Sequence, residues 1–152
     1  MFTKTVWIFA VTAVLIAGGI YYYQEHTSLA TIVEQQMKNE AVDYSIGIKY
    51  PFFSGVRHEL ELNNTVWTFL KIKADVFKAM VRKRNPSGSP VLHKSGFYVE
   101  YFPVVFNPQF AAIRFKISTY ITSDAHPSTT IEMFNYDLEN NSMIPGQTTG
   151  LQ

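Results

Sequence analysis

The chain has 152 residues, of which 47% are hydrophobic and 15% aromatic, so it can fill the core of one ordinary domain without disulfides or metals. Its net charge of +1 argues against a concentrated cationic surface, and we therefore expect no nucleic-acid partner. Cysteine is absent, which excludes disulfides, thiol catalysis and cysteine-ligated zinc.

The N-terminal segment 6–23 is apolar or aromatic apart from Thr12, and it contains no charged residue. A helix of this length, at about 1.5 Å per residue, would span roughly 27 Å, close to the hydrocarbon thickness of a bilayer. Lys4 precedes the segment and Glu25 follows it, which predicts a cytoplasmic N-terminus with the rest of the chain in the periplasm or outside the cell. We therefore predict a membrane anchor over 1–23. The small residues at 17–19 leave a cleaved signal peptide open as an alternative, and a buried globular helix is a third interpretation.

The segment 24–41 turns polar and shows a loose helical spacing, which predicts a short stalk helix or connector. The exported domain is then expected over 42–152. Alternation over 44–50 predicts a first strand, which Pro51 ends because proline has no N–H to donate. Weaker alternation over 56–62 predicts a second strand.

The next segment has the pattern of an amphipathic helix. Asn63 and Asn64 predict its start, because Asn side chains accept hydrogen bonds from the free N–H groups of a first turn. Apolar residues then recur at spacings of three and four: Trp67, Leu70, Ala74, Phe77 and Val81. Charged residues occupy the opposite face: Lys71, Asp75, Lys78 and Arg82. This pattern predicts a helix over 65–83 that packs against a sheet.

A β-hairpin is predicted near the C-terminus. Strict alternation over 113–121 and again over 129–138 is typical of half-buried strands, and the short polar turn 122–127 joins them. The turn would present Asp124 and His126 at its tip. Together these elements predict an α+β fold, in which an N-terminal transmembrane helix is followed by an antiparallel sheet packed against one long amphipathic helix.

Several short motifs, in this order, resemble a known family. They are the run 45–51, the helix led by Asn63, the tripeptide 125–127 and the run 135–138. Over 42–144 the chain resembles the N-terminal accessory domain of PdaC-type peptidoglycan deacetylases and the extracytoplasmic domain of lysozyme-sensing anti-sigma factors. Ser123 and Asp124 stand where that family usually has two glycines. The resemblance implies the accessory module alone, truncated at its C-terminus and without the catalytic deacetylase domain.

The sequence offers no convincing catalytic set. No two histidines have a helical His-x-x-x-His spacing, and there is no nucleophile elbow or phosphate-binding glycine loop. Asp124 and His126 could supply two metal ligands from one turn, which leaves a metal-dependent hydrolase open as an alternative. Glu59 and Glu61 would share one face of the predicted second strand, where a solvated edge is the ordinary interpretation. We therefore expect no enzyme, no metal and no cofactor.

Tyrosine rings suggest carbohydrate binding, with core packing as the alternative for each. The candidates are Tyr98, Tyr101, Tyr120 and Tyr136. The predicted ligand-binding set is Asp124, His126, Tyr120 and Tyr136. The expected function is that of a non-catalytic, membrane-anchored exported module, which contacts the membrane through 6–23 and binds peptidoglycan or an envelope protein. A structural assembly subunit is a further alternative.

Overall fold

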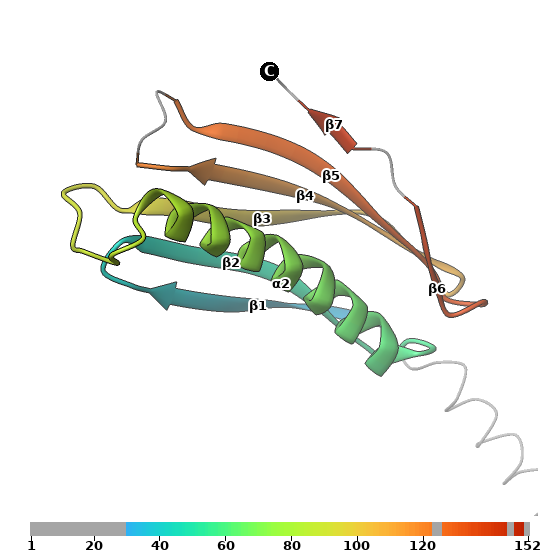
Figure 1. The fold of residues 1–152 in the computed structure, drawn as a ribbon. Helices are drawn as coiled ribbons and strands as arrows, with labels where there is room; N and C mark the ends of the chain where they lie inside the picture. Colours follow the sequence, from blue (N-terminus) through green and yellow to red (C-terminus); the bar gives the residue numbers. More distant parts are fainter. Residues whose placement is uncertain (1–29, 123–125, 146–147, 151–152) are drawn as a thin grey trace, which may run out of the picture. The chain divides into compact units, whose positions relative to one another are not determined.

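The computed structural model describes residues 30–122, 126–145 and 148–150, and these residues form one sheet and one long helix (Figure 1). The sheet has 7 strands in the order β1-β2-β3-β4-β5-β6, and β7 also pairs with β5. The strands are β1 (Thr31–Glu40), β2 (Tyr44–Ser54), β3 (Ser95–Phe106), β4 (Phe110–Tyr120), β5 (Ser128–Asp137), β6 (Ser142–Ile144) and β7 (Thr148–Gly150). The helix is α2 (Glu59–Arg84).

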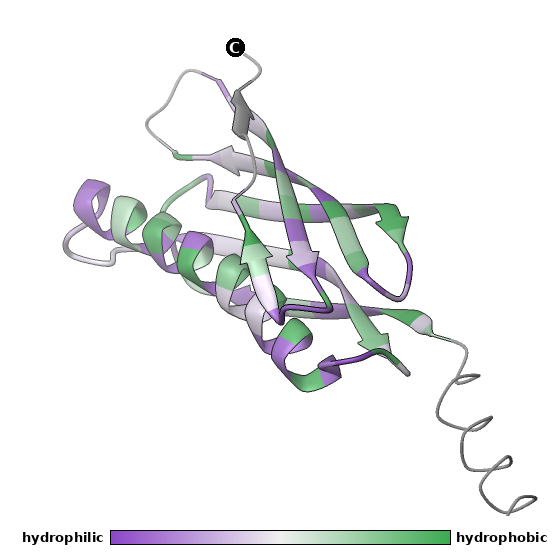
Figure 2. Ribbon diagram, turned by 90° about the vertical axis from the view of Figure 1, so that its right-hand side faces the viewer, coloured by the Kyte–Doolittle hydropathy of each residue, from purple (hydrophilic) through white to green (hydrophobic). Residues whose placement is uncertain are grey.

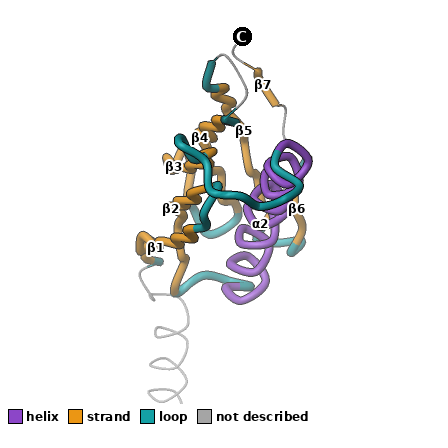
Figure 3. Tube along the Cα trace, turned by 60° about the vertical axis from the view of Figure 1, so that its left-hand side comes forward, coloured by secondary structure: helices purple, strands orange, loops and turns teal. Residues whose placement is uncertain are grey.

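The connection through α2 decides the topology of the sheet. The helix leaves the end of β2 and returns the chain to the start of β3, so these two strands are parallel, whereas the other pairs are antiparallel. The returning helix lies across one face of the sheet (Figures 1 and 3). No described element covers the opposite face, which we call the open face.

The core lies between α2 and the sheet. One row of helix side chains is buried: Leu62, Val66, Leu70, Ala74, Phe77 and Val81. Ring contacts fill the interface: the centroids of Phe69 and Phe115 are 5.7 Å apart and those of Phe77 and Phe97 are 5.5 Å apart. Burying each of these large side chains stabilises the fold by about 1.5–3 kcal/mol. The hydropathy of α2 accordingly alternates along its length (Figure 2).

The start of α2 differs from the prediction. The helix begins at Glu59, after His58 in a left-handed conformation with φ 55°. Asn63 lies inside the helix, where its side chain accepts a hydrogen bond of 2.9 Å from the Phe53 N–H and donates one of 2.8 Å to the Phe53 carbonyl oxygen. Asn63 therefore joins α2 to the end of β2 and is not the N-cap of the helix.

The prediction of a second strand over 56–62 is wrong, because residues 59–62 form the first turn of α2. Glu59 and Glu61 are acidic residues of that turn, where the helix dipole favours negative charge. The Glu59 carboxylate accepts a 2.8 Å hydrogen bond from the Gly55 N–H.

The predicted fold class is also wrong. The described residues are mostly β-strand with one helix, and the sheet is mixed. The predicted stalk helix is, in its described part, the edge strand β1. In the described part of the chain no helix is long and apolar enough to cross a membrane, and the segment 6–23 lies outside that part.

Two element predictions are confirmed, and the strand predicted over 44–50 is present as β2, although it continues through Pro51 to Ser54. The helix predicted over 65–83 is present and packs on the sheet. The predicted hairpin is the antiparallel pair β4–β5. Ile113, Phe115 and Ile117 are buried beneath the helix, as their alternation predicts.

Candidate functional site

The open face carries a groove of about 620 Å³ lined by β1, β2, β3 and β4. Alternation along the strands determines which side chains reach it. On β2, Ile46 and Ile48 point into the core, so Gly47 and Lys49 belong to the open face. The same alternation on β3 buries Val99 and places Tyr98 in the groove.

The ring of Tyr98 lines this groove and lies against two glycines, Gly47 of β2 and Gly96 of β3. A methyl group at Gly47 would lie 3.2 Å from Cδ1 of Tyr98, and one at Gly96 would lie 2.7 Å from Cε2. The ring therefore lies against the backbone at both glycines, in space that a side chain would otherwise fill. Tyr98 is nevertheless 49% exposed, so one side of the ring packs on the sheet and the other faces solvent.

Charged and hydroxyl groups surround the ring. On the neighbouring strand β4, Ser118 lies opposite Tyr98. Two residues further along β3, Glu100 lies opposite Lys116 of β4. The Lys116 ammonium lies 3.3 Å from the Glu100 carboxylate. Lys38 of β1 lies opposite Gly47, on the other side of the ring. The groove thus offers hydrogen-bond donors and acceptors on both sides of one aromatic surface.

Glu40 is a fixed carboxylate at one end of the groove. Ser45 donates a 2.5 Å hydrogen bond to it, and the Lys94 ammonium lies 3.3 Å away. The hydrogen bond from Ser45, followed by that from Lys94, holds the pKa of Glu40 below its ordinary value. Glu40 is therefore an acceptor for ligand hydrogen bonds rather than a proton donor at neutral pH.

The structure describes three of the four residues predicted to bind a ligand, and it does not bring these three together. Asp124 lies outside the described residues. His126 is exposed just before β5. Tyr120 lies opposite Gly96 and two residues beyond Ser118, so it belongs to the open face as a diagonal neighbour of Tyr98. Tyr136 is 2% exposed and lies in the core.

Tyr136 packs in the core, on the face of the sheet that α2 covers. Its ring stacks on Phe134 with a centroid distance of 6.2 Å and an interplanar angle of 6°. Its hydroxyl donates a 2.7 Å hydrogen bond to Oδ1 of Asn141. Tyr136 and Tyr120 therefore do not share a surface, and the predicted set does not form one site.

Sequence reasoning missed the contribution of β1 and β2 to the groove. The available signal was Gly47, an isolated glycine inside a clean strand pattern, which indicates close approach of another group to the backbone. Tyr98 was among the candidate tyrosines, but nothing in the sequence paired it with Gly47 from a distant strand.

Among the described residues, no group of three or more His, Cys, Asp and Glu side chains is placed to bind a metal ion. Every buried side-chain nitrogen or oxygen in the described part has a hydrogen-bond partner. The residues that line the groove offer an aromatic surface bordered by ion-paired side chains.

Fold and groove define a two-layer domain, with one helix on one face of a mixed sheet and, on the other face, a groove with an aromatic surface and a charged border. No protein-family model matches the chain, and no curated protein matches it. Among solved structures, the chain is similar to a member of the DUF3298 family from Bacteroides fragilis, with a TM-score of 0.46 and 12% sequence identity. The match covers 78% of this chain and 60% of that one, and at this level it assigns neither family nor function.

Proposed function

We propose that this chain is a non-catalytic, exported binding module whose open-face groove takes a glycan strand of the cell wall. The observation that carries the proposal is the ring of Tyr98, which lies on Gly47 and Gly96 with one side open to solvent. A sugar ring has an apolar face of C–H groups that stacks on such a surface. Because the two glycines support the ring from below, little side-chain freedom is lost when a ligand binds.

The border of the groove suits the polar part of the same ligand. Sugar hydroxyl and acetamido groups both donate and accept hydrogen bonds, and Lys116, Glu100 and Ser118 offer both kinds of partner beside the ring. Peptidoglycan also carries carboxylates and amines on its peptide stems, which lysines and glutamates can pair. The lowered pKa of Glu40 keeps this carboxylate ionised, which suits recognition better than proton transfer.

Two features of the sequence support a location outside the cytoplasm. The charge-free segment 6–23 supports export and contact with the membrane, and residues 42–144 resemble an accessory domain of peptidoglycan deacetylases. We place the module in the periplasm or at the cell exterior, facing the wall.

The test is co-sedimentation of the purified full chain with insoluble peptidoglycan, with chitin as a neutral glycan for comparison. Tyr98→Ala should weaken binding about tenfold or more, the size of an effect of roughly 1.4 kcal/mol. Tyr98→Phe keeps the ring and should bind nearly as the wild type does. Leu92→Ala, at a loop position 92% exposed, is the matched control. Wild-type binding by Tyr98→Ala would refute the proposal.

A further inference from the structure

Strand β1 leaves one edge of the sheet free in the described part of the chain. All of β1 pairs with β2, from Thr31 opposite Ser54 to Glu40 opposite Ser45, and no described strand lies on its other side (Figure 1). The opposite edge differs, because β6 and β7 cover parts of β5. A free edge ten residues long exposes backbone N–H and C=O groups that can pair with another strand.

The open-face side chains of β1 have an ordered charge pattern. Gln36 lies opposite Lys49 and Lys38 opposite Gly47, so both belong to the open face. Glu34 lies on this face as well, since Gln36 Nε2 donates a 2.9 Å hydrogen bond to its Oε1. Counted from Gln36, the chain thus has a negative charge two residues before and a positive charge two residues after.

We propose that the partner of this edge is a second copy of the chain. Two β1 strands pair antiparallel about a two-fold axis at Gln36, which places Glu34 opposite the partner's Lys38 and Lys38 opposite the partner's Glu34. Directly opposed residues of opposite charge stabilise an antiparallel pair. The two copies then share one continuous sheet in an isologous dimer.

Neighbouring registers lack this complementarity. An axis at Met37 would place Glu34 opposite the partner's Glu40, which brings like charges together. An axis at Gln35 would place Lys38 opposite the partner's Ile32, which leaves both charges without a partner across the interface. Of these three registers, only the one with its axis at Gln36 places Glu34 and Lys38 opposite each other, and its one unmatched charge is Glu40, which faces the partner's Ile32 near the end of the strand.

The dimer would bring the two grooves together. Each groove is bordered by Gln36, Lys38 and Glu40 of β1, and pairing of the two edges joins these borders on one face. The proposal does not depend on which ligand the groove takes.

Cross-linking tests the register, and the chain suits this test because it contains no cysteine. Residues at a two-fold axis face each other with Cα atoms about 4.5–5.5 Å apart, within the range of about 4.4–6.8 Å that a disulfide needs. Oxidised full-length Gln36→Cys should therefore give a covalent dimer. Asn39→Cys is the control, because its two copies would lie about 20 Å apart. Equal cross-linking of the two variants overturns the register, and no cross-linking of Gln36→Cys overturns the dimer.

Charge reversal tests the partner. Lys38→Glu and Glu34→Lys each place like charges across the axis, and each should weaken self-association in sedimentation by about tenfold or more. An equimolar mixture of the two variants restores opposite charges and should form the mixed dimer. Lys83→Glu, an exposed lysine at the end of α2, should dimerise as the wild type does. A wild-type chain that stays monomeric up to its solubility limit overturns the proposal.

Discussion

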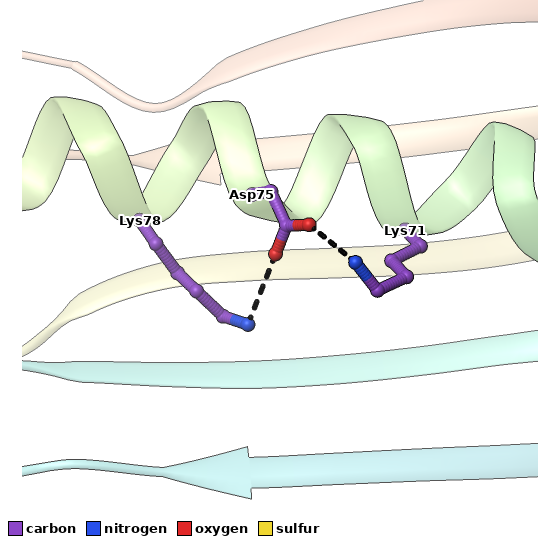
Figure 4. A network of polar contacts seen from close by, with 3 residues as sticks. All are labelled: Lys71, Asp75 and Lys78. Atoms are coloured by element: carbon purple, nitrogen blue, oxygen red, sulfur yellow. Dashed lines mark hydrogen bonds and ion pairs between the residues drawn. The ribbon is translucent and has the colours of Figure 1, made fainter.

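Lys73 of α2 and Glu132 of β5 form an ion pair with an N–O distance of 2.6 Å between the two layers of the fold. Their side chains are only 27% and 16% exposed, and the Lys73 ammonium also lies 4.6 Å from the centre of the Phe69 ring. A second group of charges lies on the outer side of the helix, where Asp75 contacts Lys71 at 2.8 Å and Lys78 at 3.3 Å (Figure 4). Those contacts stay within α2 and join it to no other element.

Lys73→Ala should lower the free energy of unfolding by about 1–3 kcal/mol, because it leaves the largely buried Glu132 carboxylate without its partner. Lys71→Ala removes an exposed pair and should be indistinguishable from the wild type. Urea denaturation of both variants measures the difference. Equal losses would show that the contact between α2 and β5 contributes nothing specific.

Asn63→Ala should destabilise the fold by about 1–3 kcal/mol, because it leaves the N–H and the carbonyl of Phe53 without partners at a partly buried position. Asn64→Ala, at the next and exposed position of the same helix, is the matched control and should cost far less. Thermal unfolding followed by circular dichroism compares the two. The interpretation fails if both variants unfold at the same temperature.

Gly96→Ala should displace the ring of Tyr98, because the new methyl group would lie 2.7 Å from Cε2. The ring is the far end of a flexible side chain and can move, so we expect the fold to remain and peptidoglycan binding to fall. Gly88→Ala is the opposite case. The new methyl group at Gly88 would have no atom within 4 Å, but the backbone φ of +62° is strained for alanine. The free energy of unfolding should therefore drop by about 1 kcal/mol, with peptidoglycan binding unchanged.

Asp137 should make stability depend on pH in the acid range. Its carboxylate accepts hydrogen bonds of 2.8 Å from the side chain and the N–H of Asn140, and these interactions, with that from the Glu139 N–H, lower its pKa. Since the folded pKa is below the unfolded value of about 3.9, the stabilisation is complete above that value and is lost as the pH falls through the folded pKa. Asp137→Asn and Asn140→Ala should each flatten this dependence in thermal unfolding between about pH 5 and pH 2. An unchanged slope in both variants would contradict the assignment.

The sequence predicted α2 and the β4–β5 hairpin because each buries one face and exposes the other. The apolar row through Leu70 and Phe77 follows the helical period, and Ile113 to Ile117 follow the strand period. Strand β1 is not predicted because it is an edge strand without a fully buried side chain, so the strand period is hidden and the loose spacing of its apolar residues resembles that of a helix. The parallel pair β2–β3 is not predicted, because the weak alternation over 56–62 indicates a strand and so interrupts the strand–helix–strand order that is typical of a crossover.

The groove was less predictable than the fold. It depends on Gly47 and Tyr98, which register places opposite each other across two strands separated by the whole of α2. The residue type of Tyr136 and its place in a motif predict a ligand residue. Its position two residues after Phe134 instead gives it the core side of β5.

The crossover through α2 also determines the order in which the strands can pair while the chain is being synthesised. Strand β2 can pair with β1 as soon as both have emerged, but its second neighbour, β3, is made only after the entire helix. Until then Ile46 and Ile48 have only the growing helix to shield them from water. The nascent chain therefore passes through a stage at which the inner edge of β2 is unpaired and its N–H and C=O groups are open to pairing with a strand of another chain.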